Sequence, residues 1–179
     1  MPELRRQDDA SPTTYRGLAF AAAATVAAAD QIAKLLAVHY LAAGPVHLFG
    51  GVHLQLVRNY AGPGGSWAGH TVLISIFTVV AAIALVVVIA RSRLDRITAL
   101  GLGLFLGGAV GNGLDRLLRE PGPLHGGVVD WLALSAHGGS MNLADLALNA
   151  AVLVMIAGAL ISLRPRKKRR RRVDTDVAA

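Results

Sequence analysis

The chain has 179 residues, of which 54% are hydrophobic and only 16% are charged. A soluble domain of this size has too little interior to bury so much apolar surface, and a disordered chain would be more polar, so the composition predicts a membrane protein. The absence of cysteine excludes disulfides and thiolate metal sites. The net charge of +7 does not indicate nucleic-acid binding, because much of it lies in one basic run at residues 167–172.

Four apolar stretches are long enough to cross a bilayer, which requires about 20 residues per helix. They are Gly17–Leu41, Gly69–Ala90, Ile97–Leu118 and Asn142–Leu163. The first stretch also resembles a cleavable secretory signal, but its apolar pattern resumes after Asp30, which favours a complete span. We therefore predict an all-α integral membrane protein with four transmembrane helices.

The basic residues predict the orientation of these spans. Fourteen of the eighteen Lys and Arg residues lie before the first span, between the second and third, or after the fourth. Because cytoplasmic flanks carry the excess of Lys and Arg, both termini are expected in the cytoplasm, with residues 40–68 and 119–141 outside. We expect a cytoplasmic segment at 1–16, a membrane domain at 17–163, and a basic tail at 164–179 that contacts phospholipid headgroups.

The first outer segment carries a strand pattern. Apolar and polar residues alternate over Val52–Leu56, and glycines lie on both sides of this stretch. We expect a small extracytoplasmic β-sheet on the outer membrane face. In the third span, Gly103, Gly107 and Gly111 recur at every fourth position, which predicts close approach of a neighbouring helix.

Polar residues in the spans gather at one depth. With the predicted orientation, all of them lie near the outer interface: Asp30 and Lys34 in the first span, Asn112, Asp115 and Arg116 in the third, and Asn142 and Asp145 in the fourth. Ionisable groups in a membrane are costly and are usually functional or paired. Two interpretations therefore stay open, a functional site or structural pairing of Asp30 with Lys34 and of Asp115 with Arg116.

Asp130 and Asp145 lack a basic residue three or four positions away, and a short segment rich in small residues separates them. Two neighbouring carboxylates repel, so that one keeps its proton, and such a pair can act as base and acid. A structural ion network would also collect carboxylates. The six histidines form no helical metal-binding pair and no HExxH motif occurs, so we predict no metal site.

Four blocks of residues, taken together, resemble the lipoprotein signal peptidases (signal peptidase II), which are four-span bacterial membrane aspartyl proteases. The blocks are Asp30-Gln31-Ile32-Ala33-Lys34; Val57-Arg58-Asn59 before a glycine-rich turn; Gly111-Asn112-Gly113-Leu114-Asp115-Arg116 with Val128-Val129-Asp130-Trp131; and Asn142-Leu143-Ala144-Asp145. The order of the blocks, the number of spans and the orientation agree as well.

The resemblance implies a role for each of these residues. Asp130 and Asp145 would be the catalytic dyad, and the remaining residues would organise the site, line it or hold the substrate: Asp30, Lys34, Asn59, Asn112, Asp115, Arg116 and Asn142. The resemblance further implies cleavage of prolipoproteins just before a diacylglyceryl-modified cysteine, without a metal or organic cofactor. A monomer in the bacterial cell membrane, with its site at the outer face, is expected.

The chain departs from the family pattern in the segment after Asn59, which is longer than usual, and at Met141 and Leu146 beside the motif of the fourth span. These departures leave a second hypothesis, a non-catalytic four-span protein such as a degenerate paralogue that binds lipidated peptides, or a small transporter subunit. A transporter places its polar residues near the midplane, often with inverted repeats. Neither feature is found in this sequence.

Overall fold

The computed structural model describes residues 14–62, 65–135 and 138–163. Four of its helices are long and apolar enough to cross a membrane: α1 (Arg16–Tyr40), α2 (Thr71–Arg91), α3 (Arg96–Leu118) and α4 (Leu143–Ser162). The four predicted spans are confirmed, each to within two residues at either end. Most of the expected N-terminal segment and all of the expected basic tail lie outside the described residues.

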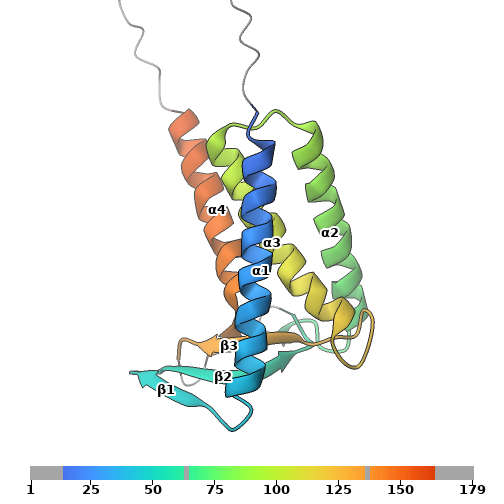
Figure 1. Ribbon diagram of the computed structural model, residues 1–179, viewed down its shortest axis with the longest axis vertical. Coiled ribbons are helices and arrows are strands. Elements are labelled where there is room, and N and C mark those ends of the chain that lie inside the picture. The colour runs from blue at the N-terminus through green and yellow to red at the C-terminus, as the bar shows by residue number, and fades with distance from the viewer. Residues whose placement is uncertain (1–13, 63–64, 136–137, 164–179) are drawn as a thin grey trace, which may run out of the picture.

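The four helices run side by side, and a small sheet covers one end of the bundle (Figure 1). The short connection from α2 to α3 lies at the other end, where α1 begins and α4 finishes. Helix α3 is central, because α1, α2 and α4 all pack against it. One end of the bundle therefore carries the α2–α3 connection, and the sheet covers the other end.

The sheet is antiparallel and has the strand order β1-β2-β3-β4. Its strands are β1 (Val46–Phe49), β2 (Val52–Asn59), β3 (Val128–Ala133) and β4 (Ser140–Met141). The predicted strand at Val52–Leu56 is confirmed as part of β2. Asp130 lies in the middle of β3, opposite Val57 of β2. The sequence pattern did not predict this strand, because β3 depends on pairing with a strand about seventy residues earlier in the chain.

The glycines of α3 allow α1 to approach closely, as predicted. A Cβ atom on Gly107 would lie 2.6 Å from Val26 Cβ and 2.8 Å from the Ala23 carbonyl oxygen. A Cβ atom on Gly111 would lie 2.6 Å from Asp30 Oδ2. The missing side chains therefore bring the two backbones together and leave room for a carboxylate of α1 against α3.

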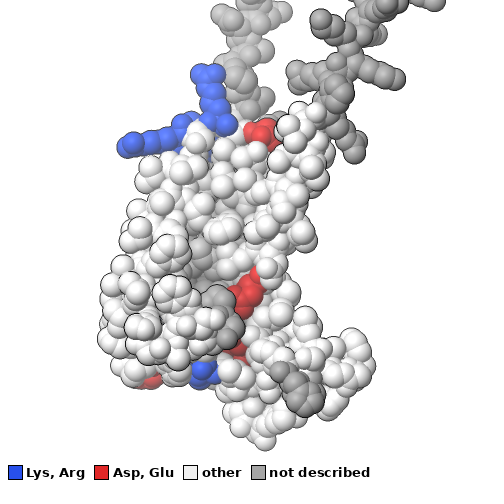
Figure 2. All heavy atoms as spheres, turned by 180° about the vertical axis from the view of Figure 1, so that it is seen from behind, with Lys and Arg blue, Asp and Glu red and all other residues white. Residues whose placement is uncertain are grey.

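The helix surfaces are apolar where they face outward. Large side chains such as Phe77 (73% exposed) and Leu153 (68% exposed) point away from the bundle. In Figure 2 most of the visible bundle surface is uncharged; basic side chains gather at the end away from the sheet, and a few charged groups lie toward the sheet. An apolar surface of this extent is suited to lipid and would be unfavourable in water.

We predict that Gly107→Ala destabilises the protein, because the new methyl group has no space between α1 and α3. Overpacking of this kind costs about 1–3 kcal/mol. Thermal unfolding of the purified protein in detergent measures the effect. Gly113→Ala is the matched control, since its Cβ meets only Thr78 Cγ2 at an ordinary 3.5 Å. Equal stability of the two variants would contradict close packing of α1 on α3.

Candidate active site

The residues singled out from the sequence come together where the helices meet the sheet. They come from five parts of the fold: Asp30 and Lys34 from α1; Asn59 from β2; Asn112, Asp115 and Arg116 from α3; Asp130 from β3; and Asn142 and Asp145 from the start of α4. Hydrogen bonds or ion pairs connect all of them except the Arg116 side chain.

Asp130 is buried, with 2% of its surface exposed. Its Oδ1 accepts a hydrogen bond from Asn142 Nδ2 at 2.6 Å, and its Oδ2 accepts one from Asn59 Nδ2 at 3.0 Å. The Asn59 amide is itself oriented, because its Oδ1 accepts from the Ala61 backbone N–H at 3.1 Å. Both carboxylate oxygens of Asp130 are therefore fixed by side-chain amides.

Asp145 lies in the first turn of α4 and is half-buried. Its Oδ1 accepts from Asn112 Nδ2 at 2.9 Å. Its Oδ2 accepts from the Asn142 backbone N–H at 3.2 Å, as part of a capping box that satisfies free N–H groups at the helix start. The sequence forms α4 from this point because Asn142 is a favourable N-cap residue.

Asn142 connects the two carboxylates. Its Nδ2 donates to Asp130 Oδ1, and its Oδ1 accepts from the Asp145 backbone N–H at 3.0 Å. The same Nδ2 donates to Asn112 Oδ1 at 3.1 Å. One buried amide thus places Asp130 of the sheet beside Asp145 of the bundle.

The surroundings of Asp130 change its acidity. Burial raises the pKa of Asp130 to about 6, although the hydrogen bonds from Asn59 and Asn142 act in the opposite direction. The negative charge of Asp145 raises this pKa as well. Asp130 can therefore hold a proton at a pH at which an ordinary aspartate is ionised.

Next to the two carboxylates, and linked to Asp145 through Asn112, Lys34 forms the centre of a buried ion network. Its Nζ lies 2.8 Å from Asp30 Oδ2 and 2.9 Å from Asp115 Oδ2, and all three side chains are fully buried. It also donates to Asn112 Oδ1 at 2.9 Å. The predicted pairing of Asp30 with Lys34 is therefore confirmed, and Asp115 joins the same pair.

This network also holds the backbone beside each of the two dyad candidates. Asp115 Oδ2 accepts from the Val129 N–H at 2.9 Å, directly before Asp130. Asp30 Oδ1 accepts from the Ala144 N–H at 2.9 Å, directly before Asp145. The position of each carboxylate thus depends on a carboxylate that is bound to Lys34.

The predicted pairing of Asp115 with Arg116 is wrong. Asp115 instead pairs with Arg119, whose Nε lies 2.6 Å from Asp115 Oδ1. Residues four apart share a helix face, whereas adjacent residues point in different directions. Arg116 is 4% exposed, and its Nη1 has no hydrogen-bond partner among the described residues.

The sequence did not single out Arg119 or Gln31 as part of the site. Gln31 Nε2 donates to the Gly111 carbonyl at 2.9 Å and to Asp115 Oδ1 at 3.3 Å, which ties α1 to α3. The i, i+4 spacing of Asp115 and Arg119 was a signal for the ion pair. Gln31 stood beside Asp30 in an apolar span, but nothing local showed which helix it would contact.

No group of three or more His, Cys, Asp or Glu side chains in the described part of the chain is arranged to hold a metal ion.

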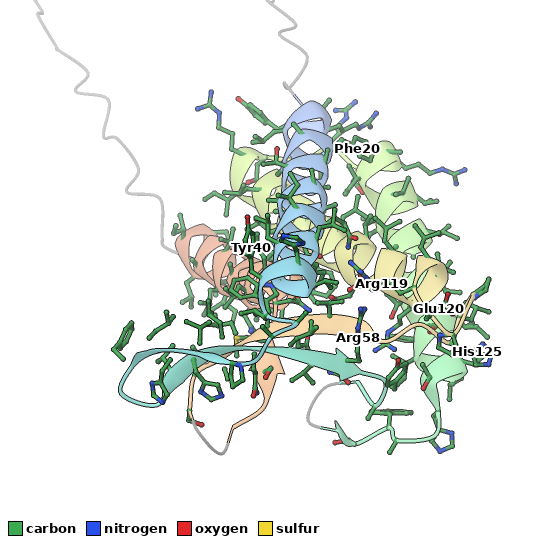
Figure 3. The ribbon with its side chains drawn as sticks, turned by 60° about the horizontal axis from the view of Figure 1, so that its bottom comes forward. Phe20, Tyr40, Arg58, Arg119, Glu120 and His125 are labelled. Atoms are coloured by element: carbon green, nitrogen blue, oxygen red, sulfur yellow. The ribbon has the colours of Figure 1, made fainter. Side chains whose placement is uncertain are left out.

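Figure 3 shows Glu120 and His125 on the segment after α3, at the edge of the molecule. Arg58 lies on β2 in the same view, with Arg119 at the end of α3.

Comparisons with known proteins agree with this arrangement. Residues 22–161 match the family model described as signal peptidase (SPase) II. A lipoprotein signal peptidase of Rhodococcus jostii is 38% identical over 91% of this chain and 86% of its own length. One from Mycobacterium avium is 38% identical over 70% of this chain and 69% of its own length. One from Mycobacterium leprae is 29% identical over 99% and 89%, respectively.

The fold has solved counterparts. A structure described as a bacterial membrane enzyme superposes with a TM-score of 0.72 over 88% of this chain and 96% of its own, at 22% identity. A second with the same description has a TM-score of 0.68 over 83% and 96%. At these identities the superpositions show a shared fold.

We predict that Asp115→Asn lowers the stability of the protein, because Lys34 and Arg119 then lose a buried charge partner. Removing one member of a buried pair costs about 3–5 kcal/mol. The yield of folded protein and its thermal unfolding in detergent report the loss. Glu120→Gln removes an exposed carboxylate nearby and serves as the control. Equal losses in both variants would contradict the network.

Proposed function

We propose that this chain, which belongs to the signal peptidase II family, is an intramembrane aspartyl endopeptidase that removes signal peptides from prolipoproteins. Cleavage would occur just before a diacylglyceryl-modified cysteine. The observation that carries the proposal is the pair Asp130 and Asp145, joined through Asn142 at the end of an apolar bundle. The relatives named lipoprotein signal peptidase support it over a non-catalytic four-span protein or a transporter subunit.

The two carboxylates have different surroundings and therefore different roles. Asp130 is buried and has a raised pKa, which suits the acid. Asp145 is half-buried and water can reach it, which suits the base. Asp145 accepts a proton from water as the water oxygen bonds to the peptide carbonyl carbon, and Asp130 gives its proton to the carbonyl oxygen. When the C–N bond breaks, Asp145 returns a proton to the leaving nitrogen and Asp130 recovers its own.

The other residues support this step. Asn59, Asn112 and Asn142 orient the carboxylates through the hydrogen bonds described above. Arg116 contributes a buried guanidinium group with a free Nη1, which can donate to the substrate or organise the site. The network of Asp30, Lys34 and Asp115 fixes the backbone beside both carboxylates.

The placement of charge supports an orientation with both termini in the cytoplasm and the site at the outer face. Arg16, Arg91, Arg93 and Arg96 all lie at the end away from the sheet. The lipidated cysteine would then keep its acyl chains in the bilayer, where burial supplies about 0.8 kcal/mol per methylene, while the peptide bond meets water. We expect contacts with membrane phospholipids. We also expect the protein to be a monomer, since one chain supplies both carboxylates and the residues that hold them.

The proposal predicts that Asp130→Asn and Asp145→Asn each reduce cleavage of a lipidated prolipoprotein by at least about a hundredfold, the scale of general acid–base catalysis. Both variants should still insert into membranes and fold, but at a somewhat lower unfolding temperature, because the amide nitrogen of asparagine cannot accept one of the two hydrogen bonds that each carboxylate accepts. Glu120→Gln is the control and should cleave normally. Wild-type cleavage by either dyad variant would overturn the assignment.

The pH dependence gives a second test. The active dyad holds one proton, so kcat/KM should fall as the pH rises through the pKa of Asp130, about 6 in the free enzyme. The Asn59 hydrogen bond lowers this pKa. Asn59→Ala should therefore move the upper limb of the profile to higher pH, whatever it does to the maximal rate. A limb that stays in place or moves to lower pH would contradict the role of Asp130 as the acid.

A further inference from the structure

Two adjoining hollows form a groove along α3 and α4, and α2 borders only the part nearer the sheet. The part of the groove nearer the sheet has a volume of about 340 Å³ and an apolar lining. Leu85 of α2, Leu102 and Phe105 of α3, and Val152 and Ile156 of α4 contribute to it. A second part, of about 420 Å³, adjoins the first at Met155 and continues toward the end of the bundle away from the sheet.

The far end of the groove carries a negative charge. Asp95 lines it together with Thr98, Ala159 and Ser162. Asp95 is exposed and is the only acidic side chain at this end among the described residues, where the other charges are arginines. Seen from behind in Figure 2, one acidic group stands at the basic end and others lie toward the sheet, with an uncharged surface between them.

The faces of α3 and α4 that line the groove also carry residues of the site. On α4, Asp145, Val152 and Ala159 are seven residues apart, and on α3 the same spacing joins Asn112 to Phe105, so each set lies near one helix face. The 17 residues from Asp145 to Ser162 rise by about 26 Å along the helix. The distance along α4 from the level of the dyad to the level of Asp95 is therefore nearly the thickness of a bilayer core.

Resting on the proposed function, we propose that this groove holds the apolar helix of the substrate's signal peptide, with the basic segment that precedes it next to Asp95. Signal peptides have a positively charged segment followed by 7–15 apolar residues. A 15-residue helix is about 23 Å long, so a peptide bond held at the dyad places the basic segment at the level of Asp95. A phospholipid with an anionic headgroup would meet repulsion there.

Asp95→Asn tests the charge, because asparagine is an equally good N-cap and can still accept from the Ile97 and Thr98 N–H groups. Two purified lipidated prolipoproteins are compared, one with Lys and Arg before its apolar segment and one with Gln at those positions. The variant should lose about threefold in kcat/KM, through KM, for the basic substrate alone, as for an exposed charge pair. Equal values for variant and wild type, or equal losses on both substrates, would overturn recognition by Asp95.

Ala159→Phe tests the groove itself by filling it, and Ala157→Phe is the matched control, because Ala157 is exposed on the same helix but does not line the groove. Ala159→Phe should lower kcat/KM about tenfold for the full prolipoprotein. It should leave cleavage of a short lipopeptide that lacks the apolar segment unchanged. Wild-type behaviour of Ala159→Phe on both substrates means that a lipid, or nothing, occupies the groove, and overturns the inference. Failure of the wild-type enzyme to cleave either substrate would instead refute the proposed function.

Discussion

The structure depends on one buried ammonium group, that of Lys34, which two carboxylates share. Charges at this depth are costly unless each has a partner, so Asp30 and Asp115 must both reach Lys34 for the bundle to close. Each of these carboxylates uses its remaining capacity to hold a backbone N–H, at Ala144 and at Val129. The ion pairs that compensate the buried charges in the membrane therefore also position the residues next to the dyad.

The network can form only because α1 and α3 lie close together. Gly107 and Gly111 present no side chain to α1, and the space beside Gly111 is filled by the carboxylate of Asp30. Gln31 of α1 donates a hydrogen bond to the carbonyl oxygen of the same Gly111. This bond adds a polar interaction to the contact between α1 and α3. The small residues of α3 thus have two effects. They let α1 pack closely, and this close packing brings Lys34 of α1 within ion-pair distance of Asp115 of α3.

The proposed chemistry depends on the contrast between the two aspartates. Asp130 stands on a strand of the sheet and is almost completely buried, whereas Asp145 begins a helix and is half-exposed. Asn142 bonds to both, as N-cap of the helix and as donor to the strand residue. Because sheet and bundle meet at this side chain, the pair lies at the polar end of an apolar body, where lipid and water can both reach a substrate.

The sequence by itself determined what depends on local periodicity and composition. Four apolar stretches predicted the spans, the i, i+4 spacing predicted the Asp30–Lys34 pair, and the polar residues at one depth indicated the site. Only the tertiary structure decided which distant groups meet. In the tertiary structure, Asp130 lies on a strand that pairs with β2, and Asp115 forms ion pairs with Arg119 and Lys34. Partners in a buried network are chosen by the packing of whole helices, because the desolvation of each charge depends on every element around it, and no local pattern carries that information.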